Sequence, residues 1–244
     1  MSGPSPAGGY YAESLSAERL RRCYQIAPPR VERYLGEEIR FVLERISPTD
    51  RVLELGCGYG RVAQPLARAA RLVVGIDTAL ASLRLARALV PPELPLRFAA
   101  MDAARLGFPD RTFDVVACVQ NGICAFHLDP AALLREAMRV ARRPGRVLIS
   151  TYAAAFWPER LEWFRLQAAE GLVGPIDEEK TRPGLIVCRD GFSAGTFEPE
   201  AFRALCAGLG VEPRLTEVDG SSLFCELKVQ AAGAISKWRC TAPP

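Results

Sequence analysis

The chain has 244 residues, of which 49% are hydrophobic and 24% are charged, and its formal net charge at pH 7 is +3. A chain of this size and composition buries a core without disulfides or a structural metal, which places it among ordinary globular proteins. Its 31 basic residues are interspersed with 28 acidic ones, and no apolar run reaches the roughly 18 residues of a membrane span. Neither a nucleic acid nor a membrane is therefore an expected partner.

The N-terminal part predicts a tail followed by helices. Residues 1–9 lack a basic stretch followed by an apolar one, so we expect a short disordered tail rather than a signal peptide, and a cytoplasmic protein. Residues 14–46 carry apolar side chains at near-helical spacing. Pro28 and Pro29 must break this stretch into two helices, because proline does not fit a helix interior. Residues 1–46 are thus predicted to form a tail and a helical cap.

Short apolar strands and helices then alternate along the chain. The expected strands are 51–55, 72–77, 96–100, 113–119 and 146–152, and the expected helices are 61–70, 79–89 and 130–142. Asp129 is a plausible N-cap for the last of these helices, with Pro130 at its first position. This alternation is typical of βαβ units and a parallel sheet.

The C-terminal part departs from simple alternation. Its expected elements are a helix at 157–170, a hairpin within 184–197, a helix at 199–209, and strands at 211–218 and 222–229. The Asp-Gly turn between the last two strands predicts an antiparallel pair. The predicted fold class is α/β: a Rossmann-like doubly wound sheet, mostly parallel with an antiparallel C-terminal hairpin, plus N-terminal helices. We expect residues 47–244 to form this domain, with a cap insertion at about 153–197.

A glycine-rich turn follows the first expected strand. Residues 56–60 read Gly-Cys-Gly-Tyr-Gly, so backbone can approach a ligand closely there, just before a helix that offers unpaired N–H groups. The spacing differs from the Gly-x-Gly-x-x-Gly of dinucleotide-binding proteins. Three acids accompany the turn: Glu54 before it, Asp77 at the end of the second strand and Asp102 after the third. Open α/β sheets bind ligands at this edge.

With these motifs the sequence resembles the class I S-adenosylmethionine-dependent methyltransferase family over roughly residues 50–230. The resemblance implies S-adenosylmethionine as cofactor, with Glu54 near its amino group and the glycine backbone against its methionine portion and ribose. It implies that Asp77 accepts from both ribose hydroxyls, and that Asp102 accepts from the adenine amine between Met101 and Ala103. The candidate cofactor-binding residues are Glu54, Gly56, Cys57, Gly58, Gly60, Asp77, Thr78, Met101, Asp102, Ala103 and Gln120.

The acceptor site is expected to begin after the fourth strand, at residues 120–127. Nucleic-acid enzymes of the family that methylate amino groups carry an Asn/Asp-Pro-Pro-aromatic motif there, which this chain lacks, so we predict a small-molecule acceptor. His127 is a candidate general base, although a loop or packing histidine is the alternative. Methyl transfer needs mainly alignment, so a catalytic constellation is not required. The candidate substrate-binding residues are Tyr11, Tyr24, Asn121, Cys124, Trp157 and Trp163.

Three other functions stay open at this point. The chain has eight cysteines but no Cys-x-x-Cys pair and a single histidine, so no metal site is predicted. Some members of the family that the sequence resembles methylate thiols or arsenite, the latter held by several Cys thiolates. Cys57, Cys118, Cys124 and Cys188 could converge near the cofactor in this way. The other two functions are a non-catalytic cofactor-binding protein and an NAD-dependent oxidoreductase. The oligomeric state is not visible in the sequence.

Overall fold

Five apolar segments form the parallel part of a seven-stranded sheet in the computed structural model, which describes residues 9–230. The parallel strands are β1 (Arg51–Leu55), β2 (Leu72–Asp77), β3 (Leu96–Ala100), β4 (Phe113–Cys118) and β5 (Ala141–Tyr152). The strand order is β3-β2-β1-β4-β5-β9-β8. Because the order reverses between β1 and β4, a crevice opens at the carboxyl ends of these strands.

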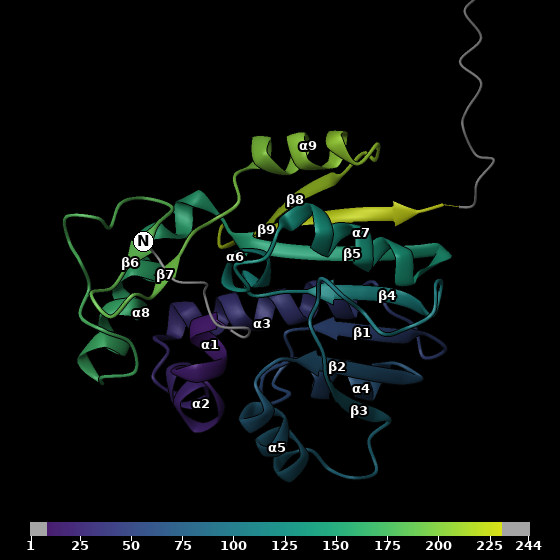
Figure 1. Cartoon of the computed structure of the whole chain (residues 1–244), viewed down its shortest axis with the longest axis horizontal. Helices are drawn as coiled ribbons and strands as arrows, with labels where there is room; N and C mark the ends of the chain where they lie inside the picture. Colours follow the sequence, from purple (N-terminus) through teal and green to yellow (C-terminus); the bar gives the residue numbers. More distant parts are fainter. Residues whose placement is uncertain (1–8, 231–244) are drawn as a thin grey trace, which may run out of the picture.

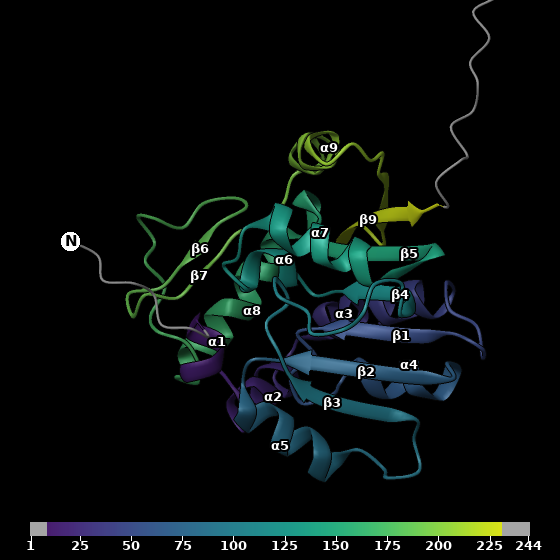
Figure 2. The ribbon, with the colours of Figure 1, turned by 45° about the vertical axis from the view of Figure 1, so that its right-hand side comes forward.

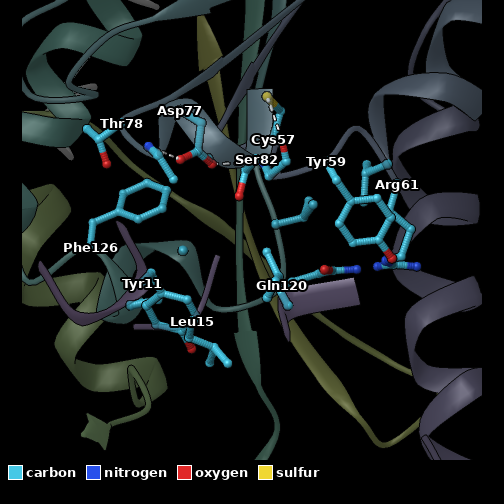
Figure 3. Close-up of a pocket in the computed structure, with 18 of the residues that line it drawn as sticks. Tyr11, Leu15, Cys57, Tyr59, Arg61, Asp77, Thr78, Ser82, Gln120 and Phe126 are labelled. Carbon is cyan, nitrogen blue, oxygen red and sulfur yellow. Dashed lines mark hydrogen bonds between the residues drawn. The ribbon is translucent and has the colours of Figure 1, made fainter. Parts of the chain in front are cut away.

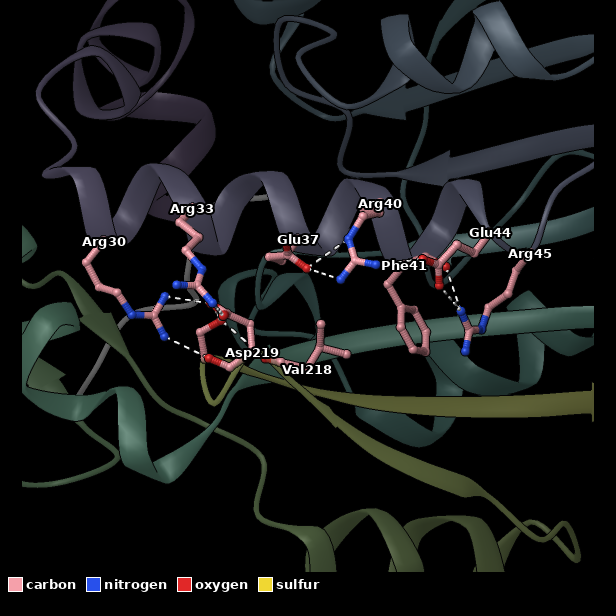
Figure 4. Close-up of polar contacts among 10 residues, drawn as sticks. Arg30, Arg33, Glu37, Arg40, Phe41, Glu44, Arg45, Val218 and Asp219 are labelled. Atoms are coloured by element: carbon pink, nitrogen blue, oxygen red, sulfur yellow. Dashed lines mark hydrogen bonds and ion pairs between the residues drawn. The ribbon is translucent and has the colours of Figure 1, made fainter.

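The C-terminal hairpin completes the sheet. β8 (Arg214–Val218) and β9 (Ser222–Val229) pair antiparallel, and β9 also pairs antiparallel with β5. Asp219 and Gly220 in the turn have φ values of 55° and 61°, as the tight turns of two-residue hairpins require. The Asp219 carboxylate pairs with Arg30 and Arg33 of helix α3 (Pro29–Leu43), which ties the hairpin turn to that helix (Figure 4). The expected antiparallel hairpin is confirmed.

Helices cover both faces of the sheet. Alternate side chains of β4 point to opposite faces of the sheet. Val116 and Cys118 pack in a first core on one face, and Val115 and Ala117 pack in a second core on the other. The first core is closed by α6 (Gly122–Ala125), α7 (Pro130–Val140) and α9 (Pro199–Gly208), and the second by α3 and α4 (Ala63–Ala69). Helix α5 (Leu80–Leu89) lies beside β2 and β3. The predicted doubly wound arrangement is confirmed.

Two segments far apart in the sequence lie together beyond the carboxyl ends of the parallel strands (Figures 1 and 2). The first holds α1 (Gly9–Glu13) and α2 (Ala17–Gln25); the second holds η1 (Ala154–Phe156), α8 (Trp157–Ala169), β6 (Ile186–Val187) and β7 (Ser193–Ala194). They share an apolar core that includes Leu15, Cys23 and Phe164. The Trp163 indole N–H donates to the carbonyl of Cys23 at 2.9 Å. We refer to these two segments, residues 9–27 and 153–197, as the cap segments.

The elements differ from the sequence predictions at a few boundaries. Helix α4 begins at Ala63 rather than at residue 61, because Gly60, with φ of 85°, still belongs to the turn. Strand β5 begins at Ala141, since it pairs with Phe113 before a register shift. Helices α1 and α6 were not predicted, as both are too short for a periodic signal. The expected tail lies outside the described residues except for Gly9. No helix within residues 9–230 is both long and apolar enough to cross a membrane.

Candidate functional site

The glycine loop after β1 is held against the end of β2. The backbone N–H groups of Gly56 and Cys57 both donate to the Ile76 carbonyl at 2.9 Å, and that of Gly58 donates to Asp77 Oδ2 at 2.8 Å. Gly56 has φ of 74°, and a Cβ there would overlap the Phe126 ring. Glycine is therefore required at this position by conformation and by space.

A cavity of about 490 Å³ opens beyond this loop (Figure 3). On the sheet side it is lined by Glu54, Gly56, Cys57, Gly58, Asp77, Thr78, Met101, Asp102, Ala103 and Gln120. On the other side lie residues of the cap segments, among them Tyr11, Leu15, Leu20, Tyr24, Trp163 and Phe164. The cavity thus has a polar half built from four strand ends and an aromatic half built from the cap segments. Its size is that of ordinary ligand sites, about 300–1,000 Å³.

Two carboxylates in the polar half are fixed by backbone N–H groups. Asp77 accepts from Gly58 N and Ala79 N, each at 2.8 Å, so it joins the glycine loop to the start of α5. Asp102 accepts from Ala104 N at 2.8 Å. Burial raises the pKa of Asp77, and the N–H groups around it oppose that rise. Both side chains are thereby held in place at the cavity wall.

Glu54 is a buried carboxyl group with an unused oxygen. It is only 3% exposed, and its Oε2 has no hydrogen-bond partner. Burial raises the pKa of Glu54 to about 8, although the nearby Arg61 guanidinium opposes the shift. A buried carboxyl group without a partner is costly, so this side chain suits a cationic or donor group of a ligand.

Gln120 connects the sheet to the first cap segment. It follows β4 with φ of 56°, and its backbone N–H donates at 2.9 Å to both Glu38 Oε2 and Ser150 Oγ. Its side-chain Oε1 accepts from the Tyr24 hydroxyl of α2 at 3.0 Å. The amide is therefore held at the boundary between the two halves of the cavity.

Among the residues predicted to bind the acceptor or act in catalysis, Tyr11, Tyr24, Trp163 and His127 line the cavity. His127 is exposed and follows α6 with φ of 52°. Asn121 does not line it, because its amide is buried and bonded to Gly195 O and Thr151 Oγ1. Cys124 packs against the core instead, and Trp157 lines a separate cavity of about 90 Å³.

Gly60, predicted to contact the cofactor, also lies off the cavity. A Cβ at this position would meet Phe98 at 3.1 Å and Val90 at 3.3 Å, so Gly60 packs against these two side chains and not against the cavity. Its backbone N–H donates to the Cys57 carbonyl at 2.8 Å, which closes the loop. Gly60 thus shapes the turn, while Gly56 and Gly58 face the cavity.

The cysteines do not gather into a thiolate site. No group of three or more His, Cys, Asp or Glu side chains within residues 9–230 could hold a metal ion. Burial raises the pKa of the Cys124 and Cys188 thiols to about 11 and that of Cys57 well above its usual range. Because the thiolate is the form that would hold arsenite, the arsenite alternative finds no support in this arrangement.

Sequence reasoning missed several lining residues. The polar or aromatic ones are Tyr34, Tyr59, Arg61, Ser82, Phe126, Tyr152 and Gln167. Arg61 had a signal, because it directly follows the glycine motif and a charged side chain there must turn either to solvent or to the ligand. Tyr59 also had one, since it lies within the glycine motif at residues 56–60, whereas the other aromatic residues reach the cavity only through tertiary packing.

Comparisons with known proteins agree with this geometry. Residues 53–149 match a family model described as a methyltransferase domain. The chain is 34% identical over 143 residues to a 2-methyl-6-phytyl-1,4-hydroquinone methyltransferase of Synechocystis, a match covering 54% of this chain and 42% of that protein. It is 29% identical over 213 residues to a probable S-adenosylmethionine-dependent methyltransferase of Mycobacterium tuberculosis, covering 84% of this chain and 70% of the relative. The chain thus spans under half the length of the first of these relatives.

Among solved structures, a protein of Pyrococcus horikoshii superposes with a TM-score of 0.59 at 21% identity, covering 90% of this chain and 94% of the other. At this identity the likeness shows the fold alone. The fold and the glycine loop with its three acids define a Rossmann-like protein that binds an adenosyl cofactor. Residues 53–149 belong to a methyltransferase-domain family, and the resemblance to the class I S-adenosylmethionine-dependent methyltransferases is confirmed. The predictions of fold class, family and cofactor are confirmed, and the oxidoreductase alternative is set aside.

The residues present fit the cofactor of that family. S-adenosylmethionine carries a positively charged sulfur and an ammonium group, and Glu54 offers a buried carboxyl oxygen without a partner in the same cavity. Gly56 and Gly58 line the cavity with bare backbone, and a Cβ at Gly56 would overlap Phe126 while one at Gly58 would meet Leu20 at 3.1 Å. Asp77 and Asp102 present carboxylates at successive strand ends, where hydroxyl and amine donors of an adenosyl group would find acceptors.

Proposed function

We propose that the chain transfers a methyl group from S-adenosylmethionine to a small aromatic or apolar molecule. The observation that carries this proposal is the division of a single cavity into a polar half at the strand ends and an aromatic half made by the cap segments. The polar residues suit the cofactor, and Tyr11, Tyr24 and Trp163 suit a flat apolar ring.

The chain's own residues account for the parts of the reaction that a protein must supply. Bound S-adenosylmethionine supplies an activated methyl group. The glycine loop, Asp77 and Asp102 hold the cofactor in one orientation, and the aromatic half holds the acceptor against it and excludes water. Alignment of this kind supplies a large part of the rate increase in displacement reactions. An acceptor that carries a proton also needs a base, and His127 lines the cavity from an exposed position.

The Synechocystis relative supports an aromatic acceptor. Its name describes a 2-methyl-6-phytyl-1,4-hydroquinone methyltransferase, and its match covers 54% of this chain. A hydroquinone ring is flat and apolar with polar edges, which matches a cavity lined by tyrosine and tryptophan. We therefore take phenols and hydroquinones as the first acceptors to examine.

Turnover with a panel of acceptors tests the proposal. Purified protein with S-adenosylmethionine should release S-adenosylhomocysteine faster with at least one phenol or hydroquinone than with no acceptor. Release without acceptor measures hydrolysis and serves as the baseline, and the Asp77→Ala variant serves as the inactive control. If the cofactor binds but no acceptor raises the rate above that baseline, the chain is a cofactor-binding protein without transferase activity, and the proposal is wrong.

Cofactor affinity is expected to increase with pH because of Glu54. Burial raises the pKa of this carboxyl to about 8, so without ligand it holds its proton through most of the range below that pH. An ammonium or sulfonium group pairs with the ionised form, so binding releases a proton. The dissociation constant for S-adenosylhomocysteine should therefore fall between pH 6 and pH 8, by up to about tenfold per pH unit. Calorimetry at several pH values measures this slope.

The Glu54→Gln variant is the matched control, since glutamine keeps the shape and cannot ionise. Its affinity should be weaker and nearly independent of pH, and an unchanged slope would contradict the assignment to Glu54. The stability of the ligand-free protein should change in the opposite direction from the ligand affinity and fall as the pH rises. A carboxyl whose folded-state pKa is raised stabilises the fold fully below its unfolded pKa of 4.5, and this stability is lost as pH rises through about 8.

A further inference from the structure

One end of the cavity gathers buried polar atoms that lack partners. Within residues 9–230, Glu54 Oε2, Arg61 Nε and Nη2, and Gln120 Nε2 are all buried and without a hydrogen bond. All three side chains line the same cavity, and Figure 3 shows Arg61 and Gln120 at one end of it, beside Tyr59. Leaving one such atom unpaired costs free energy, so several in one place point to a ligand that pairs with them.

The chemistry of these atoms specifies the ligand group. Glu54 offers an acceptor, whereas Arg61 and Gln120 offer donors. The Arg61 charge opposes the raised pKa of Glu54, yet their end atoms remain unpaired, so the two side chains are close but not bonded to each other. A ligand that satisfies all three carries a cation and, close by, an anion with two acceptor oxygens. An α-amino acid group has this arrangement on a single carbon atom.

Tyr24 of α2 fixes the two donors. Its hydroxyl donates to Gln120 Oε1 at 3.0 Å, and with the amide in this orientation Nε2 is the free end. The Arg61 guanidinium carbon lies 4.6 Å from the centre of the Tyr24 ring, a cation–π contact. The donors are therefore arranged before any ligand binds, and one cap segment holds them.

We propose that Arg61 and Gln120 bind the carboxylate at the amino-acid end of the cofactor, opposite Glu54. The proposal rests on the proposed function in taking S-adenosylmethionine as the ligand. A carboxylate of the acceptor has the same chemistry, but the neighbouring Glu54 favours the cofactor because only an amino-acid group places an ammonium beside the carboxylate. Tyr24 then links recognition of the cofactor to the cap segments.

Decarboxylated S-adenosylmethionine, which keeps the sulfonium and the amine but lacks the carboxylate, gives the test. Calorimetry measures the dissociation constants of both ligands for the wild-type protein and for Arg61→Met. The wild type should bind S-adenosylmethionine about tenfold or more tightly than the decarboxylated form, as charged hydrogen bonds of this kind suggest. In Arg61→Met that preference should fall below about threefold, with the decarboxylated ligand bound nearly as in the wild type.

Two variants complete the comparison. Arg61→Lys keeps the positive charge but cannot form a bidentate pair with a carboxylate, so it should retain part of the preference for S-adenosylmethionine over the decarboxylated ligand. Arg68→Met removes an exposed arginine on α4 and should leave the preference unchanged. If Arg61→Met does not fold, the wild type and Arg61→Lys still decide the matter, because equal wild-type affinity for the two ligands overturns the proposal.

The possible failures are distinguishable. Equal weakening of both ligands by Arg61→Met would assign Arg61 a purely structural role and overturn the inference while leaving the proposed function intact. An unchanged preference in Arg61→Met, together with weaker binding of a carboxylate-bearing acceptor, would assign the subsite to the acceptor and also overturn it. If the wild type binds neither S-adenosylmethionine nor S-adenosylhomocysteine, the proposed function itself fails.

Discussion

Replacing Asp77 by alanine is expected to weaken the binding of S-adenosylhomocysteine about a hundredfold or more. The Asp77 carboxylate accepts from Gly58 N and Ala79 N at 2.8 Å, so its removal takes away the bond that holds Gly58 against the end of β2. It also removes the acceptor proposed for the ribose hydroxyls. Loss of two or more hydrogen bonds to a charged group accounts for an effect of this size. Isothermal titration calorimetry measures it.

The matched controls are Asp77→Asn and Asp110→Asn. Asparagine at position 77 keeps the size and one acceptor oxygen, so its effect should be smaller than that of alanine. Asp110 is an exposed carboxylate paired with Arg139 away from the cavity, and its replacement should leave the affinity unchanged. Wild-type affinity in a folded Asp77→Ala variant would contradict the placement of the cofactor against this residue.

Replacing Trp163 by alanine is expected to lower the free energy of unfolding by about 3 kcal/mol or more, the usual cost of deleting a buried tryptophan side chain. Trp163 is 4% exposed and packs with Val31 and Tyr34 of α3. Its indole N–H donates to Cys23 O, so it also joins α8 to α2. Urea unfolding followed by circular dichroism measures the change.

Two further variants separate the contributions of Trp163. Trp163→Phe keeps an aromatic ring but loses the bond to Cys23 O, so it should cost less than alanine. Leu166→Ala on the same helix removes a side chain that is 39% exposed and should cost clearly less. If Trp163→Ala and Leu166→Ala were equally mild, Trp163 would not hold the cap segments together.

The sheet and the glycine loop were predictable because their signals are local. Short apolar runs that end in Gly or Asp mark the parallel strands, and the Asp-Gly turn marks the terminal hairpin. Strand ends are neighbours at one edge of any parallel sheet, so Glu54, Asp77 and Asp102 could be brought together without knowing the packing. The structure indeed places all three at one cavity.

The aromatic half of the cavity was less accessible to prediction. Trp157 and Trp163 both lie on α8, yet only Trp163 lines the main cavity, because the direction of each side chain depends on how the helix packs against α2 and α3. Asn121 lies next to Gln120 in sequence, but it is turned into the protein to bond Thr151 and Gly195. Such long-range choices have no local pattern in the sequence.

Calorimetric titration with S-adenosylhomocysteine, the demethylated form of the cofactor, and separately with NAD tests the central claim that the crevice beyond β1 binds the adenosyl cofactor. We predict one site per chain for S-adenosylhomocysteine and no detectable heat with NAD. Saturable, tight binding of NAD, together with no detectable heat on titration with S-adenosylhomocysteine, would contradict this claim.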